Sequence, residues 1–327
     1  MYMKYLITGI TGFAGPHLAN VLHNEGHEIY GLVRGSNGME TDILDIVSDN
    51  VFSKITFLYS DLKNFRTLTN IFKDHKFDGV FHLAAQSHPP TSFTDPIGTF
   101  ETNVMGSVNL IQAILDNQPD CKLMFCSSVE VYGNEGIDQR NIKEDNVIIP
   151  ANPYGATKAA IDVYLQERMK NKQINAFITR AFCHSGPRRG KTFSISSDAY
   201  QIGRMMKGHQ EKVLKIGNLE TTRVVMDVRD IVMGYYLLMI NDKSSGEVFN
   251  ISGDTPRKMR YYADKLKELS GLEGIEEVIE PKFWREIDID YQMGNDEKFR
   301  KLTGYQNKYD IDTTMKDLLD YWVKKIE

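Results

Sequence analysis

The sequence predicts an α/β fold built on a doubly wound parallel sheet of the Rossmann type, followed by a smaller C-terminal substrate-binding domain. Short apolar segments alternate with amphipathic segments along the N-terminal half, as they do when strands and helices alternate. The first apolar segment runs into a glycine-rich turn and the start of a helix, which together form a cradle for a pyrophosphate. With 327 residues, the chain is long enough for one large domain or two.

Composition argues against several classes of function. The chain has 39 basic and 44 acidic side chains and a net charge of −5, so we expect no nucleic-acid partner. No apolar run is long enough to span a membrane, and the chain starts directly with a strand pattern, so we expect neither a membrane span nor a cleavable signal. Cys121, Cys126 and Cys183 form neither a disulfide framework nor a metal-ligand cluster, so we expect no metal. These features favour a cytoplasmic protein.

The turn GITGFAG lies between a strand expected at residues 4–8 and a helix expected at about 16–25. Its first glycine permits a tight turn, its second a close approach of phosphates, and its third close packing of helix on strand. The spacing is GxxGxxG, which alone does not exclude a plain loop. Because the turn directly follows the first strand, we expect a dinucleotide cofactor there, contacted by Gly9, Thr11, Gly12, Phe13 and Gly15.

The end of the second strand, expected at 28–33, bears on which dinucleotide binds. An acidic residue at this place holds the ribose 2′-hydroxyl of NAD. The chain instead has Arg34, with no carboxylate before Glu40. An arginine can pair with the 2′-phosphate of NADP, although a solvated loop arginine is also consistent with the sequence. We expect NADP, with NAD as the alternative.

Further strands are expected at 55–59, 79–83, 122–126 and 175–180, with a long helix from about Phe100 to Asn117. A later helix begins near Tyr154 and has Lys158 one turn further on. A lysine at this spacing lies on the same face and can stabilise a phenolate, so the pair could move a proton while a cofactor moves a hydride. An ordinary pair on a helix surface would have the same spacing.

Four motifs in this order, TGITGFAG, LAAQSH, SSVEVYG and PYGATK, resemble those of extended short-chain dehydrogenase/reductases that act on nucleotide sugars. The resemblance covers nearly the whole chain and implies that Ser128, Tyr154 and Lys158 are catalytic. It also implies an asparagine, Asn103, that braces the active-site helices, and helices that pair across a homodimer or homotetramer. Asp61 would contact the adenine, although the cap of a helix is an alternative role. The remaining cofactor contacts are expected at Leu62, Ala84 and Ala85.

Glu130 narrows the expected chemistry. In the sugar-nucleotide 4,6-dehydratases that this stretch resembles, a carboxylate two residues after the catalytic serine or threonine removes the proton from C5. Oxidation at C4 acidifies that hydrogen, water leaves from C6, and the hydride returns to C6 without net redox change. Similar 4-keto reductases can carry a glutamate at the same place, so both interpretations stay open.

Resemblances in the C-terminal part imply a GDP-sugar substrate. PRRGKTF resembles a segment of GDP-mannose 4,6-dehydratases, GNL resembles a segment of the same group near the guanosine, and DVRDIV and REID resemble stretches of GDP-4-keto-6-deoxymannose reductases. Guanidinium groups suit a diphosphate because they donate forked hydrogen bonds, although a basic surface loop is also consistent. The expected substrate contacts are Gln86, Ser87, His88, Cys183, Arg188, Lys191, Asn218, Arg223, Arg285 and Asp288.

Three departures from the resembled pattern point to an altered sugar, such as a manno-heptose, or to a different reaction. Cys183 stands where an asparagine is usual, Val224 where an aspartate is usual, and Pro89 where a valine is usual.

We expect a GDP-mannose-type 4,6-dehydratase, with a GDP-sugar 4-keto reductase or C4 dehydrogenase as the alternative. A non-catalytic NADP-sensing protein is a third hypothesis, which the intact Ser128, Tyr154 and Lys158 disfavour. The expected domains are a NAD(P)-binding Rossmann domain over 1–182, to which 213–250 partly returns, and a nucleotide-sugar-binding domain over 183–327.

Overall fold

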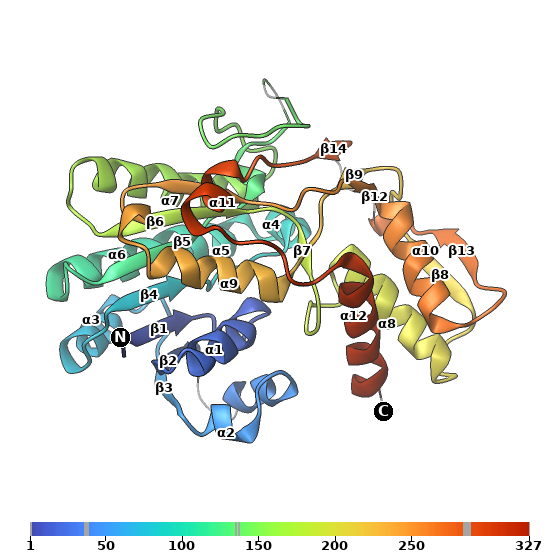
Figure 1. Cartoon of the computed structure of the whole chain (residues 1–327), viewed down its shortest axis with the longest axis horizontal. Helices are drawn as coiled ribbons and strands as arrows, with labels where there is room; N and C mark the ends of the chain where they lie inside the picture. The colour runs from blue at the N-terminus through green and yellow to red at the C-terminus, as the bar shows by residue number, and fades with distance from the viewer. Residues whose placement is uncertain (1, 36–38, 135, 137, 284–288, 327) are drawn as a thin grey trace.

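The computed structural model describes residues 2–35, 39–134, 136, 138–283 and 289–326. A seven-stranded parallel sheet with the order β11-β6-β5-β4-β1-β2-β3 forms its centre, which confirms the expected doubly wound α/β fold (Figure 1). The chain reverses the direction in which it adds strands between β1 and β4, as this fold requires. The strands are β1 (Lys4–Thr8), β2 (Glu28–Val33), β3 (Ile55–Tyr59), β4 (Gly79–His82), β5 (Lys122–Cys126), β6 (Ala176–Ala181) and β11 (Val248–Ile251).

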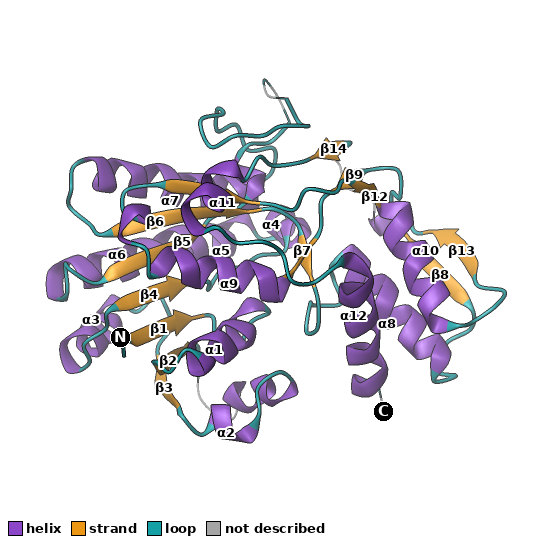
Figure 2. Ribbon diagram, in the orientation of Figure 1, coloured by secondary structure: helices purple, strands orange, loops and turns teal. Residues whose placement is uncertain are grey.

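Alternating side chains of the strands fill two apolar cores, one on each face of the sheet. In β1, Tyr5 and Ile7 belong to one core and Leu6 to the other, as the period of two along a strand requires. Two helices cover the first face and three cover the second, so the sheet is enclosed between helical layers (Figure 2). The helices are α1 (Ala14–Asn24) and α9 (Val228–Met239) on the first face, and α3 (Phe65–Asp74), α6 (Gly106–Asn117) and α7 (Pro153–Lys170) on the second.

The expected long helix begins earlier than the sequence suggested. It starts at Pro96 rather than at about Phe100, as α5 (Pro96–Phe100), and continues through the π-helical segment η2 (Glu101–Met105) into α6. The Asp95 carboxylate accepts the N–H of Gly98 (2.9 Å), and proline suits the first helical position, so the start is capped. Helix α1 likewise begins at Ala14, two residues before the expected start.

A separate apolar cluster lies in the C-terminal part of the chain, at the right of Figure 1. Three helices pack together there through side chains such as Ile202, Tyr262 and Leu318. Strand β8 pairs with β13, and β9 lies between β12 and β14 in a small three-stranded sheet. The division of the chain near residue 182 stays a prediction. These elements are α8 (Ser194–Met206), β8 (Val213–Ile216), β9 (Thr222–Arg223), β12 (Arg257–Lys258), α10 (Met259–Ser270), β13 (Glu276–Ile279), β14 (Tyr291–Gln292) and α12 (Ile311–Lys325).

Two buried aspartates of the DVRDIV stretch attach the C-terminal segment to the sheet. Asp227 caps the start of α9 and also accepts the hydroxyl of Thr314 on α12 (2.9 Å). Asp230 accepts the hydroxyl of Tyr305 (2.6 Å) and two backbone N–H groups nearby. Charge-assisted hydrogen bonds of this kind are strong, so α12 is held in a fixed position beside the sheet.

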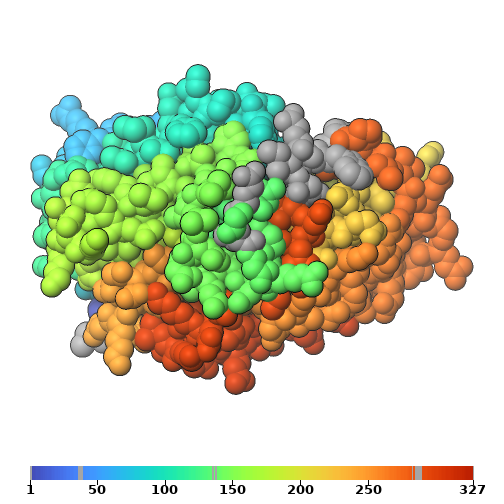
Figure 3. Space-filling model, turned by 90° about the horizontal axis from the view of Figure 1, so that it is seen from above, coloured from blue at the N-terminus to red at the C-terminus, as the bar shows by residue number. Residues whose placement is uncertain are grey.

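The segment around Ile142 lies against the segment before α11, where green meets orange-red in Figure 3. The N–H of Ile142 donates to the carbonyl of Met293 (3.0 Å), and the N–H of Asn295 donates back to the carbonyl of Ile142 (2.8 Å). The shorter elements are η1 (Met39–Asp45), α2 (Asp49–Phe52), α4 (Pro89–Thr94), η3 (Val129–Val131), β7 (His184–Ser185), β10 (Met226–Asp227), η4 (Asp242–Ser244), η5 (Pro281–Phe283) and α11 (Glu297–Thr303).

Candidate active site

Tyr154 and Lys158 lie on the first turns of α7, at the carboxyl end of β5. The Asn152 side chain caps the helix by accepting the N–H of Gly155 (2.8 Å), which fixes where the helix begins. The ammonium of Lys158 donates to the carbonyl of Cys126, the last residue of β5 (2.7 Å). Both side chains are buried, and burial is the main cause that raises the pKa of Tyr154 and lowers the pKa of Lys158. The phenol and the ammonium therefore share a dry environment.

Ser128 and Glu130 face this pair from the short η3 helix. The Ser128 hydroxyl hydrogen-bonds the Tyr154 phenol and thereby lowers its pKa, against the effect of burial. The Glu130 carboxylate accepts a hydrogen bond from the amide of Asn152 (2.7 Å), the same residue that caps α7. One asparagine therefore positions the carboxylate and the start of the tyrosine helix together.

A buried ion pair connects the elements that carry Ser128 and Tyr154. Arg180 on β6 donates two hydrogen bonds to the carboxylate of Asp162 on α7 (2.9 and 2.8 Å), and both side chains are at most 1% exposed. Asp162 also accepts the hydroxyl of Ser127 (2.6 Å), the residue next to Ser128. The guanidinium donates further to the hydroxyl of Tyr132 (2.8 Å), just after η3. The network fixes η3 against α7 and hence Ser128 against Tyr154.

Asn103 braces the loop after β4 against α7, in the position that the sequence indicated. Its side-chain oxygen accepts the N–H of Gln86 (2.8 Å), and its amide donates to the carbonyl of Gln86 (3.0 Å) and to the hydroxyl of Thr157 (2.9 Å). Asn103 belongs to the π-helical segment η2, and such segments are frequent at functional sites. Behind it, His82 lies between the hydroxyls of Thr8 (2.7 Å) and Ser107 (2.8 Å).

The glycine-rich turn has the geometry that a dinucleotide cradle needs. Gly9 has a φ of +76°, and a Cβ there would approach the backbone nitrogen of Ala84 to 2.8 Å. A Cβ on Gly15 would meet the backbone of Ile10 at 2.5 Å, so only glycine lets α1 pack this closely. Phe13 precedes α1 without a side-chain cap, and the first turn of α1 has no acidic residue, so neither offsets the partial positive charge of the N–H groups at this helix start.

The other expected cofactor residues line the same edge of the sheet. Arg34 is exposed directly after β2. Asp61 follows β3 and accepts the N–H of Lys63 (2.8 Å), so it shapes the turn before α3, and Leu62 beside it is buried. Ala84 and Ala85 follow β4, where the N–H of Ala84 donates to the hydroxyl of Thr8 (3.2 Å).

The two arginines of PRRGKTF point to different places. Arg188 turns back onto the glycine-rich turn and forms an ion pair with Asp45 (2.5 Å). Arg189 instead stacks its guanidinium over the rings of Phe193 (3.5 Å) and Phe13 (4.9 Å). Burial lowers the pKa of Arg189, while Cys183 and Tyr154 lie close enough to raise it.

Sequence reasoning missed Arg189, although it stood beside Arg188 in the same motif. Among the described residues, no ion pair or side-chain hydrogen bond engages its guanidinium, so this cation is oriented by aromatic rings and available to an anion. The ring of His184 stacks on Phe13 on the same side (5.7 Å, 13°), and burial is the main cause that lowers its pKa to about 4. His184 is therefore neutral at pH 7.

The loop after β4 meets the PRRGKTF segment. Its residue His88 packs edge-on against Phe193 (5.5 Å) and hydrogen-bonds Thr91 (2.9 Å). The Gln86 side chain accepts the N–H of His88 (2.7 Å), and Ser87 between them is exposed. The loop after β4 and the PRRGKTF segment, which are distant in the sequence, therefore contact each other.

The remaining expected substrate residues lie around the small C-terminal sheet and the segments that lead to it. Cys183 is half-buried, Lys191 lies over the ring of Tyr200 (5.0 Å), and Asn218 accepts the N–H of Glu220 (3.0 Å). Arg285 and Asp288 lie outside the described residues.

Arg223 lies in β9 between Arg257 of β12 and Gln292 of β14. The amide nitrogen of Gln292 is buried without a hydrogen-bond partner among the described residues. No sequence motif indicated Arg257 or Gln292, because strand pairing is what brings them beside Arg223.

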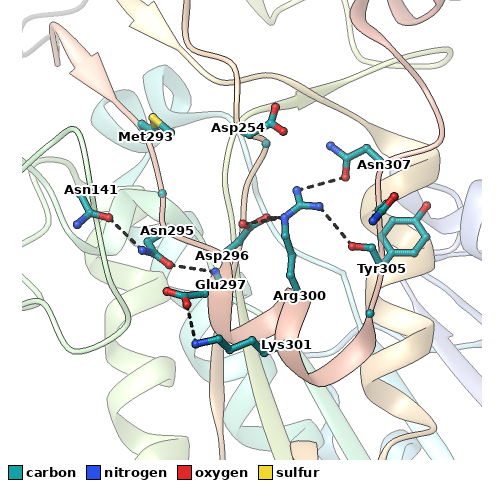
Figure 4. A pocket seen from close by; sticks show the side chains of 14 residues that line it. Asn141, Asp254, Met293, Asn295, Asp296, Glu297, Arg300, Lys301, Tyr305 and Asn307 are labelled. Carbon is teal, nitrogen blue, oxygen red and sulfur yellow. Dashed lines mark hydrogen bonds and ion pairs between the residues drawn. The ribbon is translucent and has the colours of Figure 1, made fainter.

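A large surface depression of about 870 Å³ lies elsewhere, around α11 (Figure 4). None of the residues expected at the active site lines it. Four of its five charged side chains form ion pairs, since Asp296 pairs with Arg300 (2.9 Å) and Glu297 with Lys301 (2.6 Å), while Asp254 accepts the hydroxyl of Thr255 (2.9 Å). Nothing in this depression resembles the constellation around Tyr154.

Within the part of the chain that the structure describes, no helix combines the length and apolar character needed to cross a membrane. No three histidine, cysteine, aspartate or glutamate side chains in that part gather as a metal site.

The family model described as GDP-mannose 4,6 dehydratase matches residues 6–318. The chain is 26% identical over 326 residues to GDP-6-deoxy-D-mannose reductase of Pseudomonas aeruginosa, covering 100% of this chain and 99% of that protein. It is 28% identical over 324 residues to GDP-mannose 4,6 dehydratase 1 of Arabidopsis thaliana, covering 96% and 88%.

Solved structures share the fold. RMD from Pseudomonas aeruginosa, solved in complex with NADPH, matches with a TM-score of 0.81 at 24% identity, over 99% of this chain and 100% of that chain. UDP-glucose 4-epimerase from Thermotoga maritima matches with a TM-score of 0.85 at 24% identity, over the same shares of the two chains.

Proposed function

Since the chain belongs to the GDP-mannose 4,6-dehydratase family, we propose that it is an NADP-dependent 4,6-dehydratase of a GDP-linked, mannose-type sugar. The observation that carries the proposal is the position of Glu130. Its carboxylate is fixed by Asn152 beside Ser128 and Tyr154, so that a base and a proton acceptor face one substrate site. A C4 oxidation alone would not need that second base.

NADP fits the residues present at the cofactor edge. The close-packed turn at Gly9 and Gly15 and the uncapped start of α1 suit a pyrophosphate. Arg34 follows β2, where it could pair with a 2′-phosphate, and the half-buried Arg189 offers a second cation near Tyr154. When bound, NADP supplies the acceptor and donor of hydride.

The protein's own groups supply the proton transfers. Ser128 hydrogen-bonds O4 of the sugar and Tyr154 takes the O4 proton, while the Lys158 ammonium favours the phenolate. Burial keeps the free phenol protonated at neutral pH, so its pKa must fall when cationic groups of the complex approach it. Glu130 then removes the C5 proton that the C4 ketone has acidified and passes it to the C6 hydroxyl, which leaves as water. Addition of hydride at C6 and of a proton at C5 would complete the 4-keto-6-deoxy product.

The nucleotide end is assigned to the small sheet that carries Arg223. Arg223, Arg257 and the buried Gln292 lie side by side on three strands, which suits a diphosphate and the edge of a base. Arg285 and Asp288 complete this part of the proposal by resemblance alone. Cys183, Val224 and Pro89 depart from the residues usual at these three places, which favours testing a manno-heptose as well.

A second candidate function is a GDP-sugar 4-keto reductase or C4 dehydrogenase. The observation that favours it is that the chain is about equally similar to a reductase and to a dehydratase, at 26% and 28% identity. The same Ser128, Tyr154 and Lys158 would serve this reaction.

Incubation of the purified protein with GDP-mannose or GDP-manno-heptose, without added cofactor, separates the two functions. We expect mass spectrometry to detect a product lighter by one water, with deuterium at C5 when the reaction runs in heavy water. Net consumption or formation of NADPH, with no water lost and no exchange at C5, would leave the reductase or dehydrogenase standing.

We also propose a homodimer or homotetramer in the cytoplasm. Apolar side chains on α5, η2 and α7 are exposed in the single chain, which suits a helical face that a second copy covers: Ile97, Phe100, Met105 and Val163. Sedimentation of the protein and of the variant Ile97→Asp tests this, since a charge in the interface should shift the protein toward monomer.

A further inference from the structure

Arg188 has an unusual backbone for its residue type. Its φ is +74°, in the left-handed region that side chains with a Cβ avoid. Only one other described residue apart from glycine, Lys172, has a positive φ. Such a conformation costs conformational free energy and persists where surrounding contacts offset that cost.

The contacts that offset this cost are made by the Arg188 guanidinium with two segments. Nε donates to the carbonyl of Gly12 (2.9 Å) and Nη2 to the carbonyl of Thr11 (2.9 Å), both in the glycine-rich turn. Nη1 donates to the carbonyl of Asp42 (2.6 Å) and to the carboxylate of Asp45 (2.5 Å), both in η1. A single side chain therefore joins the turn to the segment that follows β2.

Asp45 extends these contacts to the C-terminal helix. It accepts the hydroxyl of Tyr321 (2.7 Å) and the ammonium of Lys325 (3.2 Å), both on α12. Burial alone would raise the pKa of Asp45, but the hydrogen bonds from Tyr321 and Arg188 and the Arg188 charge hold it below its usual value. Asp45 is therefore an anion at neutral pH. We call Arg188, Asp45, Tyr321 and Lys325 the Arg188 clamp.

The donor count leaves little of Arg188 for a ligand. A guanidinium has five N–H donors, and the four contacts above use four of them. A forked grip on a phosphate needs two parallel donors, which this side chain no longer has. These contacts within the protein therefore compete with the expected role of Arg188 as a ligand of the sugar diphosphate.

We infer that Arg188 is a positioning residue for the dinucleotide: it holds the pyrophosphate turn and the ribose-side segment η1 at a fixed separation and anchors both to α12. The inference rests on the proposed function only in that the turn binds a dinucleotide. Because Arg188 occupies the carbonyls of Thr11 and Gly12, the orientation of these peptides is set before the cofactor arrives. A preformed site loses less conformational entropy on binding, which increases affinity.

Arg188→Gly is the decisive variant, because glycine accepts the positive φ and removes only the side chain. We expect the dissociation constant for NADPH, measured by calorimetry, to rise at least tenfold, while that for GDP changes less than twofold and the melting temperature stays within a few degrees. Arg188→Lys should not restore NADPH affinity, since one ammonium cannot reach both segments. Arg204→Ala, which removes a cation from α8 outside the clamp, is the control and should leave NADPH binding unchanged.

A double-mutant cycle tests the connection to Asp45. Asp45→Asn alone should weaken NADPH binding, and combining it with Arg188→Gly should add little, because both break one clamp. A tenfold loss of GDP affinity with intact NADPH affinity in Arg188→Gly would overturn the inference and restore Arg188 as a substrate ligand. Unchanged affinity for both would overturn it as well. If the unaltered protein binds neither NADPH nor NADH, the proposed function fails together with the inference.

Discussion

The buried ion pair between Asp162 and Arg180 gives the most direct test of how this site is supported. Asp162→Asn keeps the size of the side chain but removes the charge that faces a guanidinium exposed by only 1%. It weakens two charge-assisted hydrogen bonds of 2.9 and 2.8 Å and the bond from Ser127 of 2.6 Å. Breaking one partner of a buried pair costs about 3–5 kcal/mol, because a charge is left without compensation. We expect the free energy of unfolding to fall by that amount.

Urea denaturation followed by circular dichroism measures this change, and the same helix offers a control. Glu167 pairs with Arg168 at 3.5 Å, but these side chains are 54% and 31% exposed. Glu167→Gln should therefore cost less than about 1 kcal/mol. At urea concentrations below the unfolding transition, the Asp162→Asn variant should also have a lower turnover rate, because the weakened bond to Ser127 holds the neighbouring Ser128 less firmly. If the free energy of unfolding falls by less than about 1 kcal/mol in Asp162→Asn, the reasoning is refuted, because Arg180 is then not left as an uncompensated buried charge.

The remaining predictions concern chemistry, cofactor and pH. Glu130→Gln should lower the dehydration rate about 10²–10⁴-fold while its bound cofactor becomes reduced, which the nicotinamide absorbance reports; full dehydration activity would exclude Glu130 as the base. Tyr154→Phe should block even cofactor reduction, since the O4 proton has no acceptor, and a normal reduction rate would contradict this. Arg34→Ala should weaken NADP binding and leave NAD binding nearly unchanged, whereas equal loss for both would count against a 2′-phosphate contact. Burial lowers the pKa of His82 to about 3, so the unfolded chain binds a proton that the folded chain does not between about pH 6.5 and 3. The free energy of unfolding should therefore fall as the pH drops through this window, by up to about 1.4 kcal/mol per pH unit. Urea denaturation should show a smaller fall in this free energy between pH 7 and pH 5 for His82→Gln than for the unaltered protein.

Local sequence patterns were enough to predict the central sheet and the neighbourhood of Tyr154. Strand periodicity and glycine positions depend on local geometry, so residues 4–8, 28–33 and 55–59 were predicted with the bounds that the structure has. The spacing of Tyr154 and Lys158 places them one helical turn apart, and the carboxyl end of β5 brings Ser128 and Glu130 to them. Asn103 also lies where the resemblance placed it, bonded to the β4 loop and to α7.

The directions of the charged side chains, in contrast, became known from long-range contacts. Arg188 and Arg189 are neighbours of one type, and the positive φ of Arg188 sends one guanidinium to the glycine-rich turn and the other toward Tyr154. The extra turn at Pro96 and the register that aligns Arg223 with Arg257 likewise have no local signal. Side-chain direction at these places depends on partners far away in the chain, because a hydrogen bond or a strand pairing is formed by contacts in space rather than by neighbours in sequence.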